Sequence, residues 1–200
     1  MGASAIPIVL LFLLLAFSWR TIYTTNADLV RAKEWGELAR RSLPFGVMAI
    51  MALSLFVIRG YEESYVILVW MVVFGVLIVA SSRLAIPTAE RRANAAFRAG
   101  NYPVAADLYG SLAADKPLAR HHAFHGAALG ASERLEESLS ALDRSVETDP
   151  RYGIAYYNRA LVLRRLGRKT RARKDLQKAL EADLPRRFKT AARKVQEDLA

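Results

Sequence analysis

Apolar residues are concentrated in the first 84 positions of the chain, where three stretches carry no charged side chain. They cover residues 1–19, 42–58 and 64–82 and are 19, 17 and 19 residues long. A helix of 19 residues rises roughly 28 Å, close to the thickness of the hydrocarbon layer of a bilayer. The third stretch is apolar on every face, unlike a helix that packs on a soluble core. The pattern predicts transmembrane helices over about 3–19, 42–58 and 64–82.

The first stretch would also suit a secretory signal peptide. However, no Lys or Arg precedes it, and the bulky residues Phe17 and Trp19 stand where a cleavage site needs small ones. We therefore expect an uncleaved helix.

The segment 21–41, between the first two stretches, is expected to be partly helical, with Asn26 as its cap. Two interpretations remain open. It is either a helix in the membrane interface with Trp35 among the lipid headgroups, or a solvated extension of the second membrane helix. That second helix is expected to begin near Ser42, which places Pro44 in its first turn.

Lysine and arginine are distributed unevenly around the apolar stretches, which predicts an orientation. None precedes the first stretch, five lie between the first and second, Arg59 alone lies between the second and third, and more follow from Arg83 onward. Positive charge favours the cytoplasmic side. We therefore expect the N-terminus and the turn at 60–63 to face outward and everything after Arg83 to be cytoplasmic, at a plasma or bacterial inner membrane.

From residue 85 onward the pattern changes to short amphipathic helices with internal similarity. Three kinds of position recur at intervals of 33 to 35 residues: a small residue, a bulky apolar residue four positions later, and a proline near the end of the unit. They are Ala105, Ser138 and Ala172; Tyr109, Leu142 and Leu176; and Pro117, Pro150 and Pro185. A period near 34 with paired helices resembles the tetratricopeptide repeat.

This resemblance implies an all-α fold in which three helix pairs stack into a solenoid. The repeats would cover about 86–117, 119–150 and 153–185, and an amphipathic helix over 186–199 would cap the open end. Gly100 and Gly167 would allow the tight turns between paired helices. The chain then divides into a membrane anchor over 1–84 and a repeat domain over 86–200.

Composition excludes several kinds of chemistry. The chain has no cysteine, which rules out disulfides, a thiolate metal site and a cysteine nucleophile. His121 and His125 are four positions apart and would share one face of a helix, but the sequence shows no third ligand. No phosphate-binding or hydrolase motif is present. We therefore expect no enzymatic activity, no cofactor and no bound metal.

Charge is concentrated in the last quarter of the chain. Residues 87–150 carry 7 basic against 9 acidic side chains, whereas residues 151–200 carry 15 against 5, and the whole chain is at +10. The densest part is a basic patch at Arg168, Lys169, Arg171, Arg173 and Lys174. Such a patch favours an acidic protein segment or an anionic lipid surface. Nucleic acid is disfavoured, because the patch has no interleaved aromatic residues.

Tetratricopeptide proteins usually bind peptides or helices in a groove lined by the first helix of each repeat. Carried onto this chain, the resemblance implies a lining of Asn94, Phe97, Arg98, Arg120, Tyr157, Asn158, Arg164 and Arg165. Some members clamp a C-terminal carboxylate with a set of Lys, Asn and Arg residues. Asn94 matches that set, but Glu90, Phe124 and Ile154 replace other members of it. A receptor for chaperone tails is therefore disfavoured.

Taken together, these features favour a non-enzymatic, membrane-anchored scaffold or adaptor that binds an acidic or amphipathic partner segment. An accessory subunit of a membrane complex fits equally well, with Gly46, Ser54 and Gly75 as contact points in the hairpin of the second and third membrane helices. The alternative is a module that binds anionic lipid through its basic last repeat.

Overall fold

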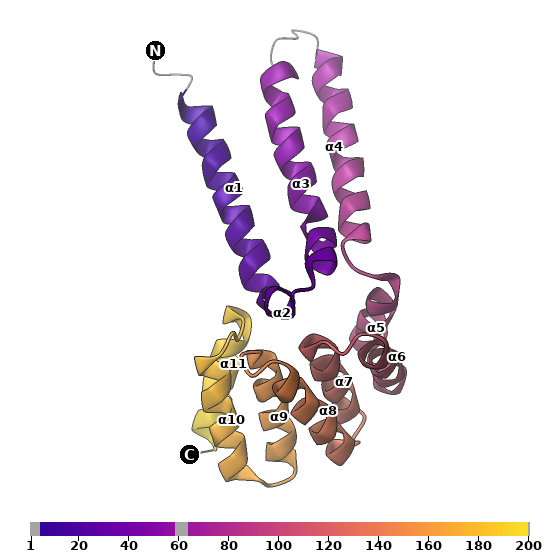
Figure 1. Ribbon diagram of the computed structural model, residues 1–200, viewed down its shortest axis with the longest axis vertical. Coiled ribbons are helices and arrows are strands. Elements are labelled where there is room, and N and C mark those ends of the chain that lie inside the picture. The colour runs from indigo at the N-terminus through magenta and orange to yellow at the C-terminus, as the bar shows by residue number, and fades with distance from the viewer. Residues whose placement is uncertain (1–4, 59–63, 200) are drawn as a thin grey trace. The chain divides into compact units, whose positions relative to one another are not determined.

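The computed structural model describes residues 5–58 and 64–199, and every regular element within these residues is an α-helix. The predicted all-α class is therefore confirmed. The chain divides into two compact units, Met1–Pro87 and Thr88–Ala200. Figure 1 shows long helices in the first unit and a series of short helices in the second.

The first unit contains four helices. They are α1 (Ala5–Thr25), α2 (Ala27–Arg31), α3 (Trp35–Ile58) and α4 (Ser64–Leu84). Arg59 and the turn at 60–63, which the sequence predicts on the outer side, lie outside the described residues.

One described segment is long and apolar enough to cross a bilayer. It is Tyr65–Leu84 in α4, with a mean hydropathy of 2.5 and only 6% of it buried. No second segment that meets this criterion is found among the described residues. The described residues therefore support one candidate span, and the prediction of three transmembrane helices is not supported.

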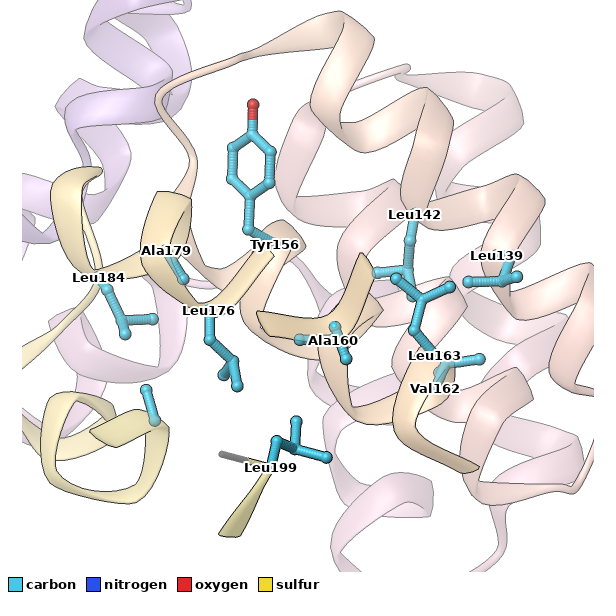
Figure 2. Close-up of a cluster of buried hydrophobic side chains, with 12 residues drawn as sticks. Leu139, Leu142, Tyr156, Ala160, Val162, Leu163, Leu176, Ala179, Leu184 and Leu199 are labelled. Carbon is cyan, nitrogen blue, oxygen red and sulfur yellow. The ribbon is translucent and has the colours of Figure 1, made fainter. Parts of the chain in front are cut away.

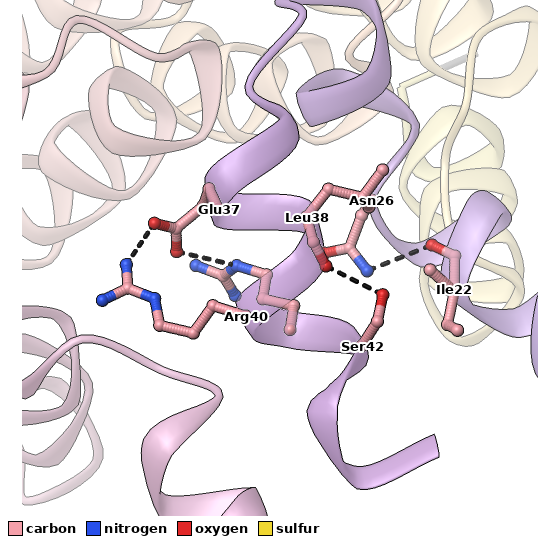
Figure 3. A network of polar contacts seen from close by, with 7 residues as sticks. Ile22, Asn26, Glu37, Leu38, Arg40 and Ser42 are labelled. Carbon is pink, nitrogen blue, oxygen red and sulfur yellow. Dashed lines mark hydrogen bonds and ion pairs between the residues drawn. The ribbon is translucent and has the colours of Figure 1, made fainter. Parts of the chain in front are cut away.

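Helix α3 begins at Trp35, well before the predicted start near Ser42. Glu37 is 8% exposed, and its carboxylate binds the guanidinium groups of Arg40 and Arg41, one turn further along (Figure 3). Such pairs stabilise a helix before its apolar part begins. Pro44 consequently lies inside α3, and its expected place in the first turn is wrong. The segment from Trp35 onward is thus a continuation of the second apolar helix.

Asn26 does not cap a helix with its side chain, contrary to expectation. It precedes the short helix α2, but its Nδ2 donates to the carbonyl oxygen of Ile22 at 3.1 Å (Figure 3). The side chain therefore reaches back to the end of α1.

Helices α3 and α4 are joined by a polar contact. The Trp70 Nε1 group donates to Ser54 Oγ at 2.8 Å, and Ser54 Oγ donates to the carbonyl oxygen of Met51 at 2.7 Å. Ser54 is thus a contact point, as expected. A Cβ built on Gly46 or Gly75 would meet nothing within 4 Å, so these two glycines are not contact points between the described helices.

The second unit consists of three helix pairs followed by one further helix. The helices are α5 (Thr88–Arg98), α6 (Tyr102–Asp115), α7 (Ala119–Ala131), α8 (Leu135–Thr148), α9 (Gly153–Arg165), α10 (Lys169–Glu181) and α11 (Arg186–Asp198). The pairs α5–α6, α7–α8 and α9–α10 fall within 86–117, 119–150 and 153–185, and α11 falls within 186–199.

The turn within each pair contains one residue in the left-handed region. Gly100 and Gly167 have φ of +76° and +72°, which glycine adopts without steric cost. The corresponding residue of the second pair is Glu133, with φ of +64°. The same turn therefore recurs in all three pairs.

The repeating small residues allow the helices of a pair to approach closely. Ala105, Ser138 and Ala172 are each 0% exposed. Ser138 Oγ donates to the carbonyl oxygen of Gly126 at 2.6 Å, which links α8 to the backbone of α7. A Cβ on Gly126 would lie 2.5 Å from Leu142 Cγ, so no side chain fits there.

The main hydrophobic cluster joins the second and third pairs to α11 (Figure 2). Leu142, Leu163 and Leu176 are each 0% exposed, and Leu199 brings the end of the cap into the same cluster. Burying a leucine side chain contributes about 1.5–3 kcal/mol. The cap therefore covers apolar surface that the last pair would leave open.

Candidate partner-binding groove

The predicted groove residues lie on the first helices of the pairs. Some of them are engaged in contacts within the chain, and others are exposed and free to contact a partner. On α5, Asn94 Oδ1 accepts a hydrogen bond from Tyr109 Oη of α6 at 2.8 Å. Phe97 packs edge-to-face against Tyr102, with ring centroids 5.3 Å apart. Both side chains hold α5 to α6. Arg98, at the end of α5, is exposed.

The α7 residue of the predicted set, Arg120, lies in the first turn of that helix and is 6% exposed. Near the end of α7, residues 126–131 are small apart from Leu129. Gly130 approaches the third pair so closely that a Cβ there would lie 3.1 Å from Val162 Cγ2. In the middle of the groove, α7 and α9 therefore pack closely against each other.

Helix α9 carries the other four predicted residues. Tyr157 is half-buried and packs on Phe188 of the cap, with ring centroids 5.6 Å apart. The Asn158 amide lies 3.5 Å from the carbonyl oxygen of Ala123 on α7. Arg165 forms an ion pair with Glu133 and donates from Nη1 to the carbonyl oxygen of Gly130 at 2.5 Å. Arg165 therefore links the third pair to the second.

Three of the predicted arginines, Arg98, Arg164 and Arg165, are exposed, and of these Arg165 is paired with Glu133. Leu161, one turn before Arg165 on α9, is half-buried and lies outside the hydrophobic clusters that the described residues form. Sequence reasoning missed it, although its place between Tyr157 and Arg165 on one helix face was readable from the spacing. Tyr157, Leu161 and Arg164 together offer aromatic, aliphatic and cationic contacts.

A partly buried ion triad links α8, α9 and α10, and the sequence analysis did not predict it. Arg159 donates from Nε and Nη2 to the two carboxylate oxygens of Asp175, at 2.7 and 2.9 Å, and from Nη1 to Asp143 at 2.7 Å. The side chains of Arg159 and Asp175 are only 15% and 8% exposed. The hydrogen bonds to Asp175 raise the pKa of Arg159 above its usual value, so its charge is fixed.

The residues of the predicted basic patch differ in whether an acidic side chain pairs with them. Arg168 is compensated, because its guanidinium donates to Glu136 of α8 at 2.8 Å. Lys169, Arg171, Arg173 and Lys174 are all exposed. An open depression of about 430 Å³ lies beside them and is lined by Glu136, Leu139, Ser140, Asp143, Arg144, Glu147, Arg168 and Arg171.

The three histidines lie on α7 and pack within the repeat. His121 Nδ1 lies 2.8 Å from the carbonyl oxygen of Lys116. Burial lowers the pKa of both His122 and His125, so both are held neutral. Among the described residues, no group of three or more His, Cys, Asp or Glu side chains is placed to hold a metal ion.

Part of the chain is similar to known proteins. Residues 125–185 match the model of the tetratricopeptide repeat family. Over 90 residues the chain is 37% identical to the TPR repeat-containing thioredoxin TTL4 of Arabidopsis thaliana; the match covers 44% of this chain and 13% of that protein. The chain thus spans a small fraction of the length of this relative.

Two solved structures of yeast Sti1 are also similar. The first is the TPR2B domain in a complex with pHsp70, which is 22% identical in sequence. The match covers 56% of this chain and 89% of the Sti1 chain, with a TM-score of 0.49. The second is the TPR2AB domain in a complex with pHSP90, which is 17% identical in sequence. The match covers 92% of this chain and 78% of the Sti1 chain, with a TM-score of 0.49.

Proposed function

We propose that the chain is a non-enzymatic adaptor that binds a protein partner through the first helices of its helix pairs, because residues 125–185 match the tetratricopeptide repeat model. The observation that carries the proposal is the surface of α9. Leu161 and Tyr157 are half-buried there and Arg164 is exposed. An apolar and aromatic strip beside a cation suits a partner segment that is acidic and partly apolar.

The adaptor is proposed to be anchored in a membrane by its first unit. Besides the candidate span in α4, helix α1 exposes large apolar side chains: Phe12 is 67%, Phe17 71% and Trp19 72% exposed. Water rarely surrounds contiguous apolar surface of this kind, whereas lipid or a partner helix covers it. This exposure favours a place in the membrane for α1 beside the candidate span in α4, and the distribution of lysine and arginine favours placing the repeats on the cytoplasmic side. An integral membrane subunit is then a second kind of partner.

Photocrosslinking in native membranes tests the adaptor proposal. A photoreactive residue replaces Leu161, which is half-buried and outside the described clusters. We expect a discrete protein adduct whose yield falls roughly tenfold when Arg98 and Arg164 are both changed to glutamate, because charge reversal opposes an acidic segment.

Arg144→Glu provides the matched control. Arg144 is an exposed arginine on α8, which is the second helix of its pair. The adduct should persist in this variant. An adduct that is unaffected by reversal of Arg98 and Arg164, or equally lost on reversal of Arg144, would contradict binding in the groove.

A further inference from the structure

The first two turns of α10 form an uncompensated cationic surface. Lys169, Arg171, Arg173 and Lys174 are exposed, and no ion pair to any of them is found in the part of the chain that the structure describes. We call these four residues the α10 cationic face. They lie within six consecutive positions on a single helix.

Most neighbouring acidic groups are already engaged elsewhere; Glu147, which lines the depression beside Arg171, is exposed and forms no ion pair with these four residues in the described part of the chain. Asp175, the acid next in sequence, is buried and binds Arg159. Glu181, at the end of α10, accepts a hydrogen bond from Gln177 at 2.9 Å. In the depression beside Arg171, Glu136 binds Arg168 and Asp143 binds Arg159. The structure thus separates the basic residues that stabilise the repeats from those of the α10 cationic face.

The α10 cationic face opposes the local stability of its own helix. The first turn of α10 has no acidic residue, and cations near the N-terminus of a helix are unfavourable because they lie at the positive end of its dipole. Lys169 and Arg173 are also like charges four positions apart, which repel. Residues that destabilise their own helix and form no compensating contact within the protein are expected where a function requires them.

We propose that the α10 cationic face docks on the anionic lipid surface of the membrane that carries the chain, which rests on the membrane anchoring proposed above. Two observations favour lipid over other polyanions. Residues 168–178 contain no aromatic side chain on which a nucleic acid base could stack. The candidate span ends at Leu84 and α5 begins at Thr88, so the repeats are tethered beside the membrane at a high effective concentration.

The proposed docking orients the groove. Each lysine or arginine near an anionic leaflet is attracted to it, so these residues together hold the repeats at the lipid surface more firmly at low salt than at high salt. The α10 face then points at lipid, and the first helices of the pairs stay available to the partner. Lipid composition would thereby control how the adaptor presents its groove.

The absence of cysteine allows a direct test with the full chain. Thr170→Cys, an exposed position within the α10 cationic face, carries a fluorophore, and the labelled chain is inserted into nanodiscs. The discs contain a headgroup-linked quencher lipid in phosphatidylcholine, with or without roughly one third phosphatidylglycerol. We expect strong quenching in the anionic discs, weak quenching in the neutral discs, and relief by salt. A label at the exposed Ser111 of α6 should be little affected.

Two matched variants distinguish the effect of the α10 cationic face from the effect of net charge. Changing Lys169, Arg171, Arg173 and Lys174 to glutamine should lower the ratio of docked to undocked chain by roughly tenfold or more. Changing Arg186, Lys189, Arg193 and Lys194 of α11 to glutamine removes the same charge and should have a much smaller effect. Equal loss in both variants, or no lipid-dependent quenching of a chain that is inserted in the discs, would overturn the proposal. A chain that does not insert would instead contradict the membrane anchor.

Discussion

Replacing Asp175 by alanine is expected to destabilise the repeats by about 3 kcal/mol. The loss follows from burial, because the Arg159 guanidinium would keep its charge at a site where its side chain is only 15% exposed. Asp143 would remain as its sole carboxylate partner among the described residues. Hydrogen exchange of the α9 and α10 amides in the full chain measures the effect, and we expect exchange to be roughly a hundredfold faster.

Asp143→Ala is the matched control, because it removes the other carboxylate from the same arginine. The Asp143 side chain is 47% exposed, so its ion pair should contribute less than about 1 kcal/mol. The double change Arg159→Met with Asp175→Leu should recover most of the stability, since apolar residues of similar volume can replace a buried ion pair. Equal losses for Asp175→Ala and Asp143→Ala would contradict the burial argument.

Gly153→Val is expected to destabilise the third helix pair by about 3 kcal/mol and to loosen the cap. A Cβ at Gly153 would lie 2.6 Å from the backbone nitrogen and 2.9 Å from the Cα of Leu184. Backbone atoms cannot rotate away as a side chain can, so the segment that leads into α11 must move. The Phe188 ring should then leave Tyr157. Faster hydrogen exchange of α11 than of α6 in the full chain would show this.

Gly100→Ala is the control for Gly153→Val. A Cβ at Gly100 would meet nothing within 4 Å, but the residue has φ of +76°. We therefore expect only backbone strain of about 1 kcal/mol, confined to the turn between α5 and α6. Unchanged exchange of α11 in Gly153→Val would contradict the close approach of Leu184 to this glycine.

The repeats were predictable because their packing requires particular residues at fixed intervals. Ala105, Ser138 and Ala172 are small because each lies at 0% exposure between the helices of its pair. Gly100 and Gly167 likewise occupy left-handed turns. Such constraints act on residue type and position, so the sequence displays them directly.

Side-chain pairing was not predictable in the same way. Arg165 was predicted to line the groove and Arg159 was assigned no role, yet both are engaged by carboxylates from other segments: Arg159 by Asp175 of α10 and Arg165 by Glu133 in the turn between α7 and α8. Which arginine is engaged depends on the rotation of α9 against α8 and α10, and the spacing of charges does not reveal this. For the same reason Tyr157 could be placed on the groove side but not against Phe188.

The start of α3 shows a related limit. The uncharged stretch indicated a helix from Ser42, because charge marks where an apolar segment ends. Helix formation does not stop at that boundary, since Glu37 binds Arg40 and Arg41 within the same helix. Apolar length therefore predicts the membrane-compatible part of a helix and not its full extent.

Both proposals depend on an anchor that holds the repeats on the cytoplasmic side of a membrane, and cysteine labelling tests this most directly. Single cysteines at Ser111 and at Glu62 are introduced into the cysteine-free chain and treated with a membrane-impermeant maleimide. In intact cells we predict labelling at position 62 and none at 111 until the membrane is permeabilised. The chain should also resist extraction by alkaline carbonate. Labelling at 111 in intact cells, or release of the chain by carbonate, would contradict the membrane-anchored adaptor.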